Sequence, residues 1–100
     1  MTTVPLQLQF DNGVLTLSGV LDSASVQVLW DQQSMLVMTL SEIALSGLVR
    51  TDTAGLAMLV HLVAQARSHG QRVRLTGVSE KLSTLSLLYN LPTSLFPVAV

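Results

Sequence analysis

Cysteine is absent from this 100-residue sequence, and charged side chains are scarce, at 11% of the residues. Without cysteine there is no disulfide bond, no thiolate nucleophile and no thiolate metal ligand. A soluble domain usually carries about 25% charged residues, so the charge here is less than half of the usual amount. The formal net charge of −1 excludes a polybasic grip on nucleic acid or on anionic lipid. The two histidines lie far in sequence from any carboxylate pair, so we expect no metal site. We also expect no cofactor.

Long hydrophobic runs are also missing, although 49% of the residues are hydrophobic. A membrane-spanning helix needs roughly 20 apolar residues, whereas the longest candidate, residues 56–64, is much shorter and contains His61. The first five residues lack the basic region of a signal peptide. We therefore expect a cytoplasmic domain without direct membrane insertion. Its apolar surface is typical of a protein that works against a partner, and it predicts self-association of the isolated chain.

Hydrophobic periodicity predicts one α/β domain over residues 1–100, because a chain of this length buries a single core. The pair Asn12-Gly13, between two alternating stretches, predicts an antiparallel hairpin. Four strands are predicted, at residues 6–10, 14–19, 43–48 and 72–76. Helices are predicted between the later strands, which implies parallel pairing with right-handed crossovers. The expected architecture is a mixed four-stranded sheet packed with three helices.

The three predicted helices are delimited by capping residues. The first runs from an N-cap at Asp22 or Ser23 to about residue 35, the second covers residues 54–69, and the third follows an N-cap at Ser79 and ends near residue 89. Gly70 ends the second helix as a glycine just past its last residue. The side chains expected in the core are Val26, Leu29 and Trp30 of the first helix, and Leu82, Leu85 and Leu88 or Tyr89 of the third.

The second predicted helix has an apolar stripe that should face the sheet. At 100° per residue the stripe is formed by Leu56, Leu59, Val60 and Val63, widened by Ala57, Leu62, Ala64 and Ala66. Met58 lies on the opposite side, either as a surface methionine without a role or as a contact for a partner, to which methionine is well suited. His61 also lies there, and we interpret it as a solvated or half-covered histidine. A metal site is disfavoured, because Gln65 one turn later is no metal ligand.

Asp52-Thr53 stands where the third strand leads into the second helix. An aspartate or threonine is a good N-cap, worth about 1 kcal/mol, and Gly55 allows a tight turn or a close backbone approach. That interpretation explains one of the two polar side chains. A hydroxyl at a helix start also lies beside free N–H groups, where a phosphoryl group is favoured, and a phosphate there would repel a docked partner. From local physics the capping role is the better supported of the two.

The segment Asp52-Thr53-Ala54-Gly55-Leu56 resembles the Asp-Ser-Ser-Gly-Leu segment of STAS domains, the sulfate-transporter and anti-sigma-factor-antagonist family. The order of elements also matches that fold. Within the family, residues 51–69 and 73–92 and the pair Leu29-Trp30 are most similar to the STAS subunits of phospholipid ABC transporters in Gram-negative bacteria. By this resemblance Thr53 falls at the family's phosphoacceptor position. Threonine replaces serine there, and Ala54 replaces the next serine.

The resemblance implies a non-catalytic subunit that binds an ABC ATPase subunit and, through it, the membrane permease. Such a subunit lies on the cytoplasmic face of the inner membrane and takes part in phospholipid traffic that maintains outer-membrane lipid asymmetry. It binds no nucleic acid. The implied contact residues are Asp52, Thr53, Ala54, Met58 and His61.

Two other functions remain open from the sequence. An anti-sigma-factor antagonist would need a kinase that phosphorylates Thr53. An enzyme is disfavoured, because nothing places a nucleophile beside a base and no carboxylate pair is spaced for acid–base catalysis. We expect no direct lipid contact, because core and interface account for the apolar residues. The apolar C-terminal residues 96–100 have two open interpretations, packing on the chain's own core or on a second copy.

Overall fold

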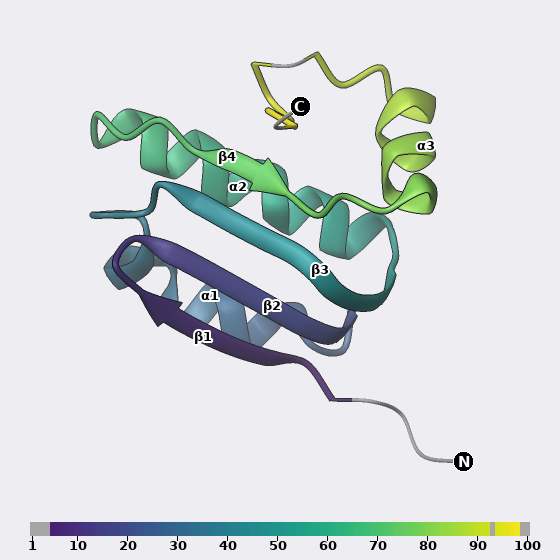
Figure 1. Ribbon diagram of the computed structural model, residues 1–100, viewed down its shortest axis with the longest axis horizontal. Helices are drawn as coiled ribbons and strands as arrows, with labels where there is room; N and C mark the ends of the chain where they lie inside the picture. The colour runs from purple at the N-terminus through teal and green to yellow at the C-terminus, as the bar shows by residue number, and fades with distance from the viewer. Residues whose placement is uncertain (1–4, 93, 99–100) are drawn as a thin grey trace.

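The computed structural model describes residues 5–92 and 94–98, and its elements follow the predicted order (Figure 1). Along the described chain these elements are β1 (Gln7–Asp11), β2 (Val14–Leu21), α1 (Val26–Leu36), β3 (Glu42–Thr51), α2 (Thr53–Ser68), β4 (Arg74–Thr76) and α3 (Glu80–Leu88). The second and third strands are longer than predicted and the last strand is shorter.

The sheet has the strand order β1-β2-β3-β4. β1 and β2 pair antiparallel, with Phe10 opposite Leu15, and the turn between them uses left-handed backbone angles at Asn12 (φ 51°) and Gly13 (φ 80°). Those angles are the ones that a two-residue hairpin requires, which is why Asn-Gly predicts it. β2–β3 and β3–β4 pair parallel. The predicted mixed sheet is confirmed.

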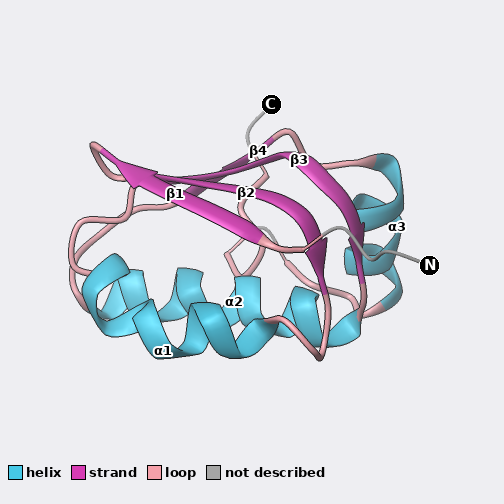
Figure 2. Cartoon of the chain, turned by 90° about the horizontal axis from the view of Figure 1, so that it is seen from below, coloured by secondary structure: helices cyan, strands magenta, loops and turns pink. Residues whose placement is uncertain are grey.

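Two helices cover one face of the sheet. Figure 2 shows α1 and α2 side by side beneath the strands, with α3 at one end of the layer. Apolar side chains from the covered faces of both layers fill the space between them, and those less than 2% exposed include Leu15, Leu17, Leu21, Leu29, Leu36, Leu40, Ile43, Leu59, Leu62 and Leu75. On the uncovered face the strands carry small polar residues, such as Thr16 and Ser18, which alternate with the buried apolar residues. This alternation is typical of a sheet with one solvated face.

The C-terminal segment packs on the chain's own fold in the part that is described. Phe96 is 3% exposed and belongs to the core. Val98 forms a parallel bridge with Leu75 at the free edge of β4. Residues 99–100 lie outside the described residues. Among the described helices, none has the length and hydrophobicity that crossing a bilayer requires.

Helix ends and faces differ from the predictions in three places. α1 begins at Val26, because the Asp22 side chain first holds a turn, accepting hydrogen bonds from the backbone N–H groups of Ala24 and Ser25. Trp30 is 51% exposed rather than buried. The third helix buries Leu82, whereas Leu88 and Tyr89 are 73% and 56% exposed. The reason is that α3 packs at the end of the layer, where the rest of the domain covers less of its surface.

Candidate interaction site

The turn between β3 and α2 is fixed by the side chain of Asp52. Its backbone is extended (φ −102°, ψ −171°), and its Oδ1 accepts a hydrogen bond from the backbone N–H of Gly55 at 3.0 Å. Its Oδ2 accepts a second bond from the backbone N–H of Ser23 at 3.3 Å. An N-cap carboxylate satisfies a free N–H group at a helix start, and here it also ties α2 to the β2–α1 turn. The predicted capping role of Asp52 is confirmed.

Gly55 lets the first turn of α2 pack directly against the end of β2. A Cβ atom at this position would lie 2.5 Å from the carbonyl oxygen of Leu21 and 2.7 Å from Cγ2 of Thr51. Because Gly55 lies inside a helix, the requirement is space and not an unusual backbone angle. Of the five residues in the Asp-Thr-Ala-Gly-Leu segment, the fold therefore accounts for Asp52, Gly55 and the buried Leu56.

Thr53 and Ala54 are the two residues of that segment that the fold leaves unexplained. Thr53 is the first residue of α2 and its side chain is exposed, whereas Ala54 is half-buried. The first N–H groups of a helix have no partner within the helix and make that end electropositive. The Thr53 hydroxyl thus lies at an accessible corner beside such groups, a position that suits contact with another molecule.

Uncharged side chains line one face of α2 over residues 53–64, before the exposed Arg67. Thr53, Ala57 and Ala64 are exposed and Val60 is half-buried, and spacings of four, three and four residues put them on one face of the helix. We call these four residues the α2 outer face. Ala57 and Ala64 were predicted to widen the core stripe, and that prediction is wrong, because the buried stripe is rotated away from them.

Met58 reveals the cause of this rotation. It was predicted to point away from the sheet, but it is 5% exposed and belongs to the core. At 100° per residue Met58 lies only about 40° from Leu62 around the helix. α1 packs beside α2 (Figure 2), so this flank of α2 is buried as well as the face toward the sheet. The prediction that Met58 points away from the core is therefore wrong, so α2 does not present this side chain at its surface.

A pocket of about 290 Å³ opens beside the α2 outer face. It is lined by Thr53, Leu56, Ala57, Val60, Tyr89 and Leu91. The turn at Asn90 positions Tyr89 and Leu91 on the far side of the pocket. Its left-handed backbone (φ 54°) ends α3 and reverses the chain, and the N–H of Leu91 donates to the carbonyl of Ser86 at 3.1 Å. The lining contains no aspartate, glutamate, lysine, arginine or histidine, so the pocket is apolar apart from the hydroxyls of Thr53 and Tyr89.

His61 lies on the other side of the α2 outer face, against α1. Its ring stacks on the indole of Trp30, with ring centroids 5.0 Å apart and planes inclined by 30°. Its Nε2 forms a hydrogen bond with Oε1 of Gln33. Of the solvated and half-covered states that the sequence left open for this histidine, the structure shows the half-covered one. Trp30 lies at the edge of the α1 core stripe, where it covers His61 instead of reaching the sheet, and it leaves an exposed aromatic surface next to the site.

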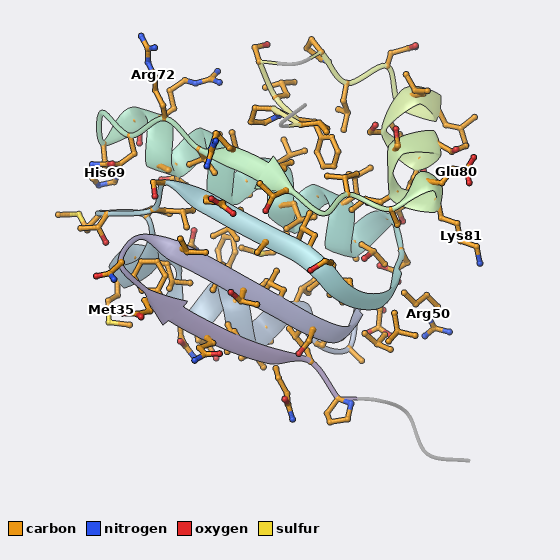
Figure 3. The ribbon with its side chains drawn as sticks, viewed as in Figure 1. Met35, Arg50, His69, Arg72, Glu80 and Lys81 are labelled. Atoms are coloured by element: carbon orange, nitrogen blue, oxygen red, sulfur yellow. The ribbon has the colours of Figure 1, made fainter. Side chains whose placement is uncertain are left out.

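Asp22 anchors the turn beside Asp52. The pKa of its carboxyl lies below the ordinary value. Partial burial raises this pKa. Hydrogen bonds to the charged form outweigh that effect and lower the pKa, and they come from the backbone N–H of Ala24, the Ser25 hydroxyl, the Arg50 guanidinium and the backbone N–H of Ser25. Arg50 Nη2 lies 3.3 Å from Asp22 Oδ2. Figure 3 shows Arg50 and Lys81 at this end of the molecule, and His69 and Arg72 at the opposite end.

Asp22→Asn is expected to reduce the acid sensitivity of the domain. Because the folded-state pKa is depressed, the charged carboxylate contributes stability above its unfolded pKa of about 3.9, and this contribution is lost as the pH falls through the lower folded value. Wild type and variant should therefore differ most at neutral pH and converge in acid, as followed by urea unfolding at several pH values. Asp31→Asn is the control, since Asp31 is an exposed α1 residue that bonds only Gln27 in the described chain. A constant difference at every pH would contradict the prediction.

Ala57 and Tyr89 are surface residues that the sequence did not predict. Threonine and alanine occupy positions 53, 57 and 64 of this helix, but alanine also occupies the fully buried position 66. Small side chains therefore do not by themselves distinguish the exposed face of this helix from the buried one. A helical wheel does not distinguish the two faces either, because alanine counts as apolar and the sequence does not give the position of α1. Among the described residues, no three His, Asp or Glu side chains cluster in a way that holds a metal ion.

Solved structures resemble this domain in fold. The anti-sigma factor antagonist SpoIIAA in its unphosphorylated form has a TM-score of 0.65 at 16% identity, covering 83% of this chain and 82% of that one. The phosphorylated form of SpoIIAA from Bacillus has a TM-score of 0.67 at 16% identity, covering 95% and 91%. The anion transporter Slc26a9 of the mouse has a TM-score of 0.53 at 19% identity, covering 76% of this chain and 14% of that one.

Sequence comparison extends the similarity. The chain is 43% identical over 83 residues to the "intermembrane phospholipid transport system binding protein MlaB" of Escherichia coli (strain K12), covering 83% of this chain and 86% of the relative. The protein of that name from Shigella flexneri matches with the same identity and coverage. A family model described as "Mlab, STAS domain" matches residues 4–97. The chain therefore belongs to the MlaB family of STAS domains.

Proposed function

We propose that this chain is the non-catalytic STAS subunit of an ABC transporter that moves phospholipid between membranes and so maintains outer-membrane lipid asymmetry. It lies on the cytoplasmic face of the inner membrane and binds the transporter's ATPase subunit, of the MlaF type, and through it the permease. Its contribution is to assemble the ATPase and support its activity. The contact surface is the N-terminal half of α2, with Thr53, Ala54 and His61, beside the turn that Asp52 holds.

The observation that carries this proposal is an exposed, uncharged face beside Thr53 in a chain that is 43% identical to MlaB. Thr53 and Ala57 are exposed, the neighbouring Tyr89 is 56% exposed, and none of them carries a charge that would need water. Interfaces place apolar and aromatic side chains at the centre and keep charge to the rim. Asp52 and Gly55 serve the fold, which leaves the outer face free for a partner.

The alternative is an anti-sigma-factor antagonist that a kinase switches at Thr53. Two observations support it: the likeness of the fold to SpoIIAA, and the exposed hydroxyl at a helix start. The likeness at 16% identity concerns the fold alone. Under this alternative the bound protein would be a kinase that regulates a sigma factor, and Thr53 would carry phosphate in cells.

A pull-down from solubilised membranes, with the tagged chain as bait, tests the proposal. We expect an ABC ATPase and its permease to be recovered and identified by mass spectrometry, and Thr53 of the bait to carry no phosphate. Recovery of a sigma-regulating kinase with phosphorylated Thr53, and without an ATPase, would replace the proposal by the alternative. The bait with Thr53→Glu is the control for capture through any other surface.

A further inference from the structure

We propose that the pocket between α2 and the residues after α3 receives one bulky apolar side chain, aliphatic or aromatic, from the ATPase subunit. This inference rests on the proposed function and names the chemistry of the contact. The pocket has Thr53 on its rim, so it is continuous with the surface that the proposed function assigns to the ATPase. The proposal adds that the interface is anchored by a projection into a cavity, and not by a flat contact alone.

The lining dictates an apolar occupant. Leu56 at 4% exposure forms the floor, and Val60 and Leu91 are half-buried at the sides. A charged or strongly polar group placed there would find no charged partner and would lose its water, which costs several kcal/mol for an ion. An apolar group gains from the same transfer. The Thr53 and Tyr89 side chains at the rim leave hydroxyls for the polar edge of such a contact.

The size of the pocket favours a side chain over a whole lipid. A dry apolar cavity of about 150 Å³ accommodates benzene, so the 290 Å³ found here has room for one aromatic or large aliphatic side chain. Pockets that enclose small-molecule ligands span about 300–1,000 Å³, and a phospholipid with two acyl chains needs far more. Interface anchors are characteristically single large side chains seated in a partner's pocket.

Ala57 keeps the mouth of the pocket open. It is exposed, lines the pocket and is the smallest of the lining side chains. A leucine there would project into the space that the occupant needs, whereas helix propensity hardly changes between alanine and leucine. Ala64 is the matched position: it is an exposed alanine on the same α2 outer face, two turns further along, and it does not line the pocket.

Ala57→Leu tests the proposal, with Ala64→Leu as its control and Tyr89→Ala as an independent variant that removes one wall. Affinity for the purified ATPase subunit is measured by calorimetry, and folding of each variant by circular dichroism and thermal unfolding. We expect Ala57→Leu and Tyr89→Ala to weaken binding about 30-fold, the size of one hot-spot contact, and Ala64→Leu to change it less than about threefold.

Four results would overturn the proposal. Wild-type affinity of folded Ala57→Leu would mean that the pocket stays empty in the complex, and equal losses in Ala57→Leu and Ala64→Leu would indicate a flat contact. Uptake of fluorescent palmitate by wild type but not by Ala57→Leu, or loss of self-association in that variant with ATPase binding retained, would make an acyl chain or a second copy the occupant. Thr53→Glu distinguishes failure of the proposed function from failure of this inference. If Thr53→Glu abolishes ATPase binding while Ala57→Leu does not, the proposed function stands and the proposed occupant of the pocket is refuted.

Discussion

Thr53→Glu is expected to abolish binding to the ATPase subunit while the domain stays folded. Thr53 is the exposed first residue of α2, and a carboxylate in the first turn of a helix is favoured by about 0.3–1 kcal/mol. The same carboxylate in a closed apolar interface loses its water and gains no partner, at a cost of several kcal/mol. Because each 1.4 kcal/mol is tenfold in affinity, the dissociation constant should rise at least about 100-fold. Calorimetry with the purified ATPase subunit measures this effect.

Two variants isolate the charge and the location. Thr53→Gln has nearly the same size as the glutamate variant without its charge, so its loss should be about tenfold or less, and Thr53→Ala should also weaken binding only modestly. Thr16→Glu introduces the same carboxylate at an exposed residue of β2, on the sheet face that α1 and α2 do not cover, and should bind like wild type. Wild-type binding by folded Thr53→Glu would refute the proposed docking surface.

The parts of the site that follow from local backbone chemistry were predictable from the sequence. Asp52 caps the helix through Gly55 N–H as its position before an apolar run predicts, and Ser79 caps α3 through the N–H of Leu82 in the same way. The hairpin at Asn12-Gly13 depends on two residues that tolerate left-handed angles. In each case the residues that determine the local structure lie within three positions of one another in the sequence, so no tertiary information is needed.

The parts that depend on which neighbour covers a helix were not predictable. A helical wheel places residues around an axis, but it does not indicate that α1 covers the flank of α2 with Met58 and leaves the flank with Ala57 open. Trp30 was expected inside because of its helical spacing from Val26 and Leu29, yet its ring stacks on His61 and is 51% exposed. Tyr89 was assigned to the core by spacing, although the Asn90 turn ends α3 there. These errors concern the residues of the site, because a surface that awaits a partner carries the same apolar residues as a core.

Gly55→Val is expected to give the largest loss of stability among substitutions in the Asp-Thr-Ala-Gly-Leu segment. A Cβ at Gly55 would meet the Leu21 carbonyl oxygen at 2.5 Å, and that oxygen cannot retreat freely, because it accepts the backbone N–H of Asp52 at 3.3 Å. Relief therefore requires α2 to move off the sheet, which should lower the free energy of unfolding by about 3 kcal/mol or more. Gly55→Ala should act in the same direction but less, since alanine regains about 1 kcal/mol of helix propensity.

Ala57→Val is the matched control for Gly55→Val, because it places the same β-branched side chain at an exposed position of α2 and should cost only about 0.6 kcal/mol in helix propensity. Urea unfolding followed by circular dichroism gives both values. Equal unfolding midpoints for the two variants would mean that α2 does not approach β2 so closely, and the account of glycine in this segment would fail. If instead Gly55→Val alone is destabilised, its remaining folded fraction should still lose affinity for the ATPase subunit, because the shifted first turn carries Thr53 with it. Stability and docking then share one cause, the contact between the first turn of α2 and the end of β2.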